Sequence, residues 1–114
     1  MVKANALNQG DVIIVSFDPA KGHEEKKTRP ALVVSNKYFN QRTNGNCVYV
    51  CAISSSDNGF PLNVPLPDGM EIHGYVFPYQ LRSMDLNSRH FKYIEHADEA
   101  LTQTVVEFIE GAMN

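Results

Sequence analysis

One arginine stands where a charged stretch of the chain meets an apolar one. The seven residues that end with Arg29 are polar or charged, Pro30 follows, and residues 31–34 are apolar. Proline disfavours helical geometry at the residue before it, so Arg29 is expected to be extended at the start of a strand. A guanidinium held in this way is suited to binding a phosphate. A surface ion pair with Glu24 or Glu25 is the alternative, and these residues alone leave both open.

A run of three hydroxyl groups is the second candidate site. Ser54, Ser55 and Ser56 follow an apolar run that ends at Ile53. Hydroxyls at the end of a strand can donate to a phosphate, or they can cap a turn. The sequence of this segment is compatible with either role.

Other chemistries have little support in the sequence. His73, His90 and His96 lack the spacing of metal ligands, so no metal or other cofactor is expected. The chain contains no glycine-rich phosphate-binding motif and no G-x-S-x-G motif. Cys47 and Cys51, four residues apart on one strand, would lie roughly 13 Å apart, too far for a disulfide. We interpret both as buried thiols of a reduced, cytoplasmic protein.

Short strands separated by turn signals must position these groups. The pattern predicts strands over residues 11–17, 31–35, 47–53 and 91–94, an edge strand over 62–66 that contains Pro65, and one or two strands over 73–77 and 81–84. The unbroken apolar run of the second strand indicates burial on both faces. Residues 36–46, which contain Asn44-Gly45, predict a helical turn followed by a hairpin-like return.

The chain is expected to end in a helix. Asp98 is a candidate N-cap, and one helical face carries Leu101, Val105, Phe108, Ile109 and Ala112. Strands followed by one helix predict a single mainly β domain over residues 1–114, built as a small antiparallel barrel or curled sheet.

Charge and hydropathy limit the function classes. The net charge is -3, but residues 93–114 contribute -5 and the rest of the chain +2, which permits a basic face on an acidic protein. No apolar run approaches the roughly 18 residues of a membrane span, and the first residues do not read as a signal peptide. No membrane association is expected.

Several short motifs, in this order, resemble those of the MazF/PemK family of toxin endoribonucleases from toxin–antitoxin modules. They are Gly10-Asp11-Val12, Phe17-Asp18-Pro19, Gly22-His23-Glu24, the run from Arg29 to Ser35, Phe39-Asn40, Ile53-Ser54-Ser55, Gly74-Tyr75-Val76 and the run from Gln80 to Asp85. The resemblance implies a Src-homology-3-like β-barrel that forms homodimers. It also implies metal-independent cleavage of single-stranded RNA by its own 2′-hydroxyl, which leaves a 2′,3′-cyclic phosphate and a 5′-hydroxyl.

The resemblance also assigns roles to individual residues. Arg29 matches the active-site arginine of the family, Ser54 matches its catalytic threonine, and Glu24 matches a carboxylate proposed as base. We expect Arg29 to stabilise the transition state, since an arginine is a poor proton donor near pH 7. Substrate contacts are expected from His23, Lys26, Lys27, Ser55, Ser56, Tyr79 and Gln80.

One departure from the family pattern changes the expected mechanism. Some members carry an arginine and an aspartate with acid and base roles just before the glutamine that matches Gln80, and here those positions are Phe77 and Tyr79. Arg29 and Ser54 must then carry the chemistry. Tyr79 is expected either to stack on a base or to lie in the core or a dimer interface.

A second function class stays open on fold alone. The same fold hosts toxins that cleave nothing and instead bind DNA gyrase. Arg29 and Ser54 favour the enzyme, because a gyrase-binding toxin has no need of them. The expected partners are single-stranded RNA, a second copy of the chain, and an antitoxin whose acidic, partly disordered segment folds on binding.

Overall fold

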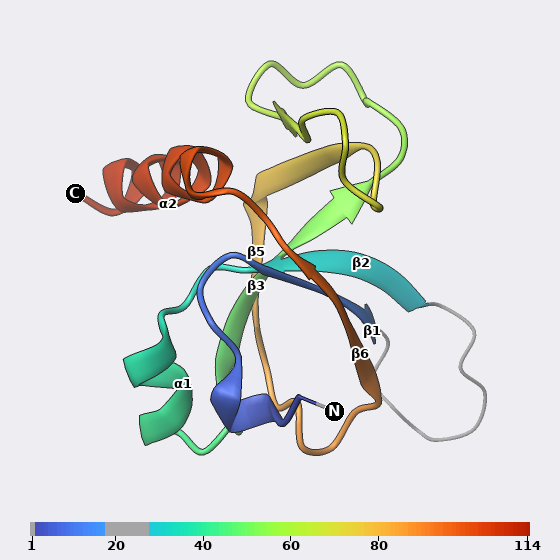
Figure 1. The fold of residues 1–114 in the computed structure, drawn as a ribbon. Helices are drawn as coiled ribbons and strands as arrows, with labels where there is room; N and C mark the ends of the chain where they lie inside the picture. The colour runs from blue at the N-terminus through green and yellow to red at the C-terminus, as the bar shows by residue number, and fades with distance from the viewer. Residues whose placement is uncertain (1, 18–27) are drawn as a thin grey trace.

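Six antiparallel strands form one curled sheet in the computed structural model, which describes residues 2–17 and 28–114 (Figure 1). The strands lie in the order β4-β5-β3-β2-β1-β6. Their bounds are β1 Asp11–Ser16, β2 Thr28–Val33, β3 Val48–Ser54, β4 Val64–Pro65, β5 Tyr75–Met84 and β6 Phe91–His96. The short helices η1 (Ala4–Ala6) and α1 (Lys37–Arg42) precede β1 and β3, and α2 (Glu99–Met113) ends the chain. This confirms the predicted mainly β fold with a C-terminal helix.

The central strands are buried on both faces, as the unbroken apolar run predicted. Ala31, Leu32 and Val33 of β2 have no exposed surface. Ala31 and Val33 belong to one apolar cluster with Ile13 and Val15, whereas Leu32 belongs to a second cluster on the opposite face. The sheet therefore separates two cores, here called the first core and the second core.

Strand β2 begins earlier than the sequence predicted. It starts at Thr28, so Arg29 and Pro30 lie within the strand and not at its junction with a loop. Pro30 pairs with Ile14 of β1, while pairing with β3 begins only at Ala31. Because a proline has no N–H to donate, it is tolerated where β2 has one neighbouring strand instead of two.

One strand covers the region where the sequence allowed one or two. β5 pairs with β3 at Leu81 opposite Cys51, and then at Val76 opposite Ile53. The extra β5 residues between these two pairs form a bulge, which contains Tyr79 and Gln80. The predicted edge strand is also confirmed, since β4 ends the sheet and, among the described strands, pairs only with β5.

Helix α2 begins and packs largely as expected. The side chain of Asp98 accepts a hydrogen bond from the backbone N–H of Leu101 at 2.9 Å, and Leu101 and Val105 are buried in the second core. The predicted apolar face is wrong at its end, because Ala112 is exposed. Val106 packs against the core in addition to Ile109. No helix in the described part of the chain is long and apolar enough to cross a membrane.

The two thiols differ in environment. Both cysteines are free, Cys51 is buried, and Cys47 is partly exposed just before β3. The prediction that both are buried is therefore wrong for Cys47. Burial raises the pKa of the Cys51 thiol from its usual 9.0 to about 12, so Cys51 is an inert core residue.

Candidate active site

Two arginines share one aromatic ring at an end of the sheet. The guanidinium carbon of Arg29 lies 5.6 Å from the centre of the Phe17 ring, and that of Arg82, on β5, lies 5.1 Å from it. Phe17 is buried at the end of β1, whereas both arginines are exposed. Within residues 2–17 and 28–114, no carboxylate pairs with either guanidinium. Two exposed positive charges on one buried ring, with no carboxylate partner among the described residues, are suited to binding an anion.

Ser54 emerges at the same end of the sheet and on the same face. The pairing of β2 with β3 ends at Ala31 opposite Ala52, and two further residues on each strand lead to Arg29 and Ser54. Side chains alternate along a strand, so Arg29 is on the same face as Ala31, and Ser54 is on the same face as Ala52. Ala31 and Ala52 both belong to the first core. Arg82 pairs with Val50, which also belongs to that core. The face of the sheet that forms the first core therefore also carries Arg29, Arg82 and Ser54. These three residues are here called the cationic end.

The hydroxyl of Ser54 is engaged in a local turn. Its oxygen donates to the carbonyl of Ser56 and accepts from the N–H of Ser56, both at 3.1 Å. The turn-capping role that the sequence allowed is therefore present. Ser54 is partly exposed, and Ser55 and Ser56 are exposed beside it.

The backbone at Ser54 is held from one side by a glycine. Gly74 has a φ of +131°, and a Cβ at this position would lie 2.1 Å from the carbonyl oxygen of Ser54 and 2.9 Å from the Cα of Ser55. No side chain fits in that space. The residue before β5 is thus packed directly against the last residue of β3.

The bulge of β5 brings Tyr79 and Gln80 to the surface near this region. Tyr79 is 37% exposed, so the core position considered for it is wrong. Phe77 is buried, and its ring stacks on that of Tyr79 with the centroids 5.5 Å apart. Gln80 is exposed. At the two positions where some family members carry an arginine and an aspartate, this chain therefore carries an aromatic stack.

Four of the expected site residues belong to the segment before β2. Glu24, His23, Lys26 and Lys27 lie outside the described residues, as does the alternative partner Glu25. Arg82 and Phe17 were not predicted as site residues from the sequence, although both belong to motifs shared with the family. Their signal is tertiary, because they meet Arg29 only after the four strands β1, β2, β3 and β5 pair.

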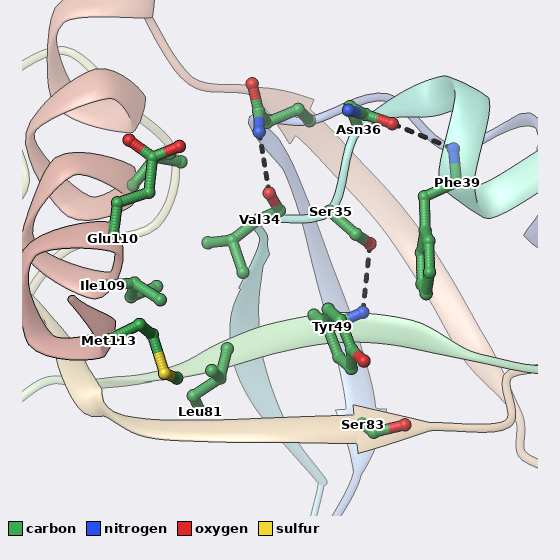
Figure 2. A pocket seen from close by; sticks show the side chains of 12 residues that line it. Val34, Ser35, Asn36, Phe39, Tyr49, Leu81, Ser83, Ile109, Glu110 and Met113 are labelled. Carbon is green, nitrogen blue, oxygen red and sulfur yellow. Dashed lines mark hydrogen bonds between the residues drawn. The ribbon is translucent and has the colours of Figure 1, made fainter.

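An apolar groove occupies the opposite face of the sheet. It has a volume of about 540 Å³ and lies between α2, α1 and the β3–β5 pair (Figure 2). Figure 2 shows Ile109 and Met113 of α2 on one side and Phe39 of α1 on the other, with Tyr49 and Leu81 from the sheet. The groove contains none of the residues of the cationic end.

Comparison with known proteins identifies the family. The family model of the PemK-like, MazF-like toxins of type II toxin–antitoxin systems matches residues 8–111. The chain belongs to this family. The resemblance inferred from the motifs is thus confirmed.

Curated members of the MazF-like family are similar over most of the chain. The endoribonuclease toxin ChpB of Escherichia coli K12 is 39% identical over 120 aligned positions, which cover 94% of this chain and all of the relative. The endoribonuclease toxin MazF of the same organism is 37% identical over 89 positions, 78% of each chain. The chain is therefore a homologue of endoribonuclease toxins.

Solved MazF structures have the same fold. The crystal structure of MazF from Deinococcus radiodurans superposes with a TM-score of 0.81 at 28% identity, covering 95% of this chain and 96% of that one. A MazE–MazF crystal structure from the same organism gives the same TM-score and coverage. An endoribonuclease bound to its cognate antitoxin, from a mycobacterial species, has a TM-score of 0.73 at 18% identity and shares the fold.

Proposed function

We propose that this chain is a sequence-specific, metal-independent endoribonuclease that cleaves single-stranded RNA through attack of the RNA's own 2′-hydroxyl. The observation that carries the proposal is the pair of exposed guanidiniums, Arg29 and Arg82, on the Phe17 ring, with Ser54 at the strand end that the register places next to Arg29. The endoribonuclease names of the curated relatives add support. The products are a 2′,3′-cyclic phosphate and a 5′-hydroxyl.

The proposed chemistry needs charge stabilisation, a base and an acid. Negative charge grows on the phosphate oxygens as the 2′-oxygen attacks, and Arg29 stabilises this charge as a planar, permanently ionised donor. Arg82 adds a second positive charge on the same ring. Ser54 donates a hydrogen bond to the phosphate after its hydroxyl rotates away from the carbonyl of Ser56. Glu24 removes the proton of the 2′-hydroxyl, the bond from phosphorus to the 5′-oxygen breaks, and a solvent water protonates the leaving 5′-oxygen.

Substrate contacts are assigned around this centre. Ser55, Ser56 and Gln80 are exposed near the cationic end and donate to the RNA backbone or to base edges. His23, Lys26 and Lys27 contribute from the segment that precedes β2. These assignments rest on the family resemblance and on the exposure of the described residues.

The decisive experiment is cleavage of a long RNA in the presence of EDTA, with the ends of the fragments mapped. We expect unchanged cleavage at a short recurring sequence, with cyclic phosphate or 3′-phosphate ends and 5′-hydroxyl ends. Loss of cleavage in EDTA that magnesium restores would rule out this mechanism. A purified protein that cleaves no RNA but inhibits DNA gyrase would support the non-enzymatic alternative.

We also propose that the chain forms a homodimer and is silenced by an antitoxin. Among the described strands, β4 and β6 each pair with one neighbour and end the sheet, and Tyr38, Tyr49 and Met113 are exposed apolar side chains. An acidic antitoxin segment that lies across the cationic end would compete with RNA. A monomeric mass in sedimentation at micromolar concentration would contradict the dimer.

A further inference from the structure

A cluster of aromatic rings forms where the loop that follows Ser54 contacts β5. Phe60 is 45% exposed, and its ring centre lies 4.5 Å from that of Tyr79, with the two planes inclined by 59°. Tyr79 stacks in turn on the buried Phe77. Monomeric proteins bury most large aromatic side chains, and two half-exposed rings in contact therefore suggest a binding surface.

The exposed rings are held rigidly by side-chain amides. The hydroxyl of Tyr79 donates to the Asn63 oxygen at 2.7 Å and accepts from the Asn58 amide at 3.2 Å. The Asn63 amide donates to Asn58 at 2.7 Å and to Asp57 at 2.9 Å. The backbone N–H of Phe60 donates to the Asn58 side chain at 3.0 Å. A ligand that stacks on these rings meets a surface that is already ordered, which lowers the entropic cost of binding.

The charge of this loop favours an uncharged aromatic ligand over a phosphate. The hydrogen bonds from Asn63 and from the N–H of Gly59 hold the pKa of the Asp57 carboxyl below its usual range. Asp57 therefore stays ionised at neutral pH and repels a phosphate at this position. The positive charges lie instead at Arg29, which precedes Ser54 in the chain, and at Arg82, which follows the bulge of β5.

We propose that Phe60 and Tyr79 form a stacking platform for one nucleobase of the RNA, next to the nucleotide whose phosphate binds at the cationic end. Asn58 is four residues after Ser54, so the loop that holds the rings starts within roughly 14 Å of that site. Each base presents a π-face, and stacking on an aromatic side chain is a common mode of single-strand recognition. This assignment rests on the proposed RNA substrate and names the part of the protein that orders one of its bases.

The test is a double-mutant cycle between protein and RNA, read as binding by fluorescence anisotropy. The probes are short single-stranded RNAs that span the mapped cleavage site, carry a 2′-deoxy nucleotide at the cleaved position, and have one abasic residue at each neighbouring position in turn. We expect one abasic position to weaken binding to the wild type by on the order of 10-fold. Phe60→Ala is expected to weaken binding of the intact RNA by a similar factor, with no further loss on that abasic RNA.

Two further variants separate stacking from general effects of the loop. Leu62→Ala removes an equally exposed apolar side chain of the same loop that is outside the stack, and it is expected to bind RNA normally. Phe60→Leu keeps apolar volume but removes the ring, and it is expected to lose most of the affinity that Phe60→Ala loses. The platform would be overturned if Phe60→Ala and every abasic RNA each lost affinity in full and independently of the other. It would also be overturned if the wild type bound no RNA. Absence of cleavage with an intact binding cycle would reject only the proposed reaction.

Discussion

On the face of the sheet that forms the first core, apolar side chains give way to charged and polar ones at a single end. Arg29 and Ser54 continue the alternation that buries Ala31 and Ala52 further along the same strands, and Arg82 of β5 lies opposite the buried Val50 of β3. The opposite face stays apolar, because α2 covers the second core and the groove beside it is lined mainly by apolar side chains. One sheet thus carries its candidate chemistry on one face and a largely apolar surface on the other.

The difference shows which residues should affect activity and which should affect stability. Exposed cations at the end of a strand contribute little to folding, since solvent screens their interactions. Buried leucines and valines contribute through the apolar area they remove from water. Substitutions on the two faces should therefore separate activity from stability.

The largest expected effect is on the cationic end. Arg29→Ala should slow RNA cleavage by about 10²- to 10³-fold, because a preorganised charge at the phosphate is lost, while the melting temperature stays unchanged. Single-turnover cleavage and thermal unfolding would measure the two. Arg29→Lys should recover only part of the rate, since a point charge lacks the planar fork. Ser54→Ala should lose less than Arg29→Ala, because it removes a neutral donor.

Arg42 offers a matched control for Arg29. It also is exposed and lies over an aromatic ring, with its guanidinium carbon 5.3 Å from the centre of the Tyr38 ring, but it belongs to α1. Arg42→Ala should cleave RNA at the wild-type rate. Equal rates for Arg29→Ala and the wild type would reduce Arg29 to a surface charge.

The next effect is on the opposite face. Leu101→Ala should lower the free energy of unfolding by about 2–5 kcal/mol, since the side chain of Leu101, on α2, is buried in the second core. Urea unfolding would measure this. Where the variant is folded, its cleavage rate should equal that of the wild type. Glu107→Ala, at an exposed position of α2, should change stability by less than about 0.5 kcal/mol.

A smaller effect should come from the glycine beside Ser54. Gly74→Ala forces the backbone of Ser54 and Ser55 to move, and a displacement near 1 Å can cost up to about 10²-fold in rate. Gly69 also has a positive φ, of +96°, but a Cβ there meets nothing within 4 Å. Gly69→Ala should therefore have the same kind of backbone strain as Gly74→Ala but cleave RNA at the wild-type rate. If both variants lose activity equally, contact with Ser54 is not the cause.

The smallest effect concerns pH and Cys51. Its pKa is about 12 in the folded chain and 9.0 when solvated, so its contribution to stability is complete below pH 9 and is lost as the pH rises toward 12. The slope from this one group is at most about 1.4 kcal/mol per pH unit. Denaturant unfolding between pH 9 and 11 would measure it. Cys51→Ala should show a shallower decline, and an identical decline would mean that other groups cause the loss.

The sequence determined much of the local structure, because those signals are short-range. The apolar run after Pro30 predicted a strand buried on both faces, and Asp98 predicted the first residue of the terminal helix. Arg29 was selected for its position before a proline, and the motif series indicated the family. The strand, the helix start and the choice of Arg29 depend on residues close together in the chain, and the family signal depends on short motifs in a fixed order.

Only the tertiary structure decided how the site is assembled. Arg82 and Phe17 meet Arg29 because β1, β2, β3 and β5 pair in one register, and a shift of one residue would turn Arg82 to the other face. Tyr79 reaches the surface because β5 bulges, and Phe60 joins it through a loop closed by Asn58 and Asn63. Strand register and bulges arise from contacts between distant segments, so no window of the sequence contains them.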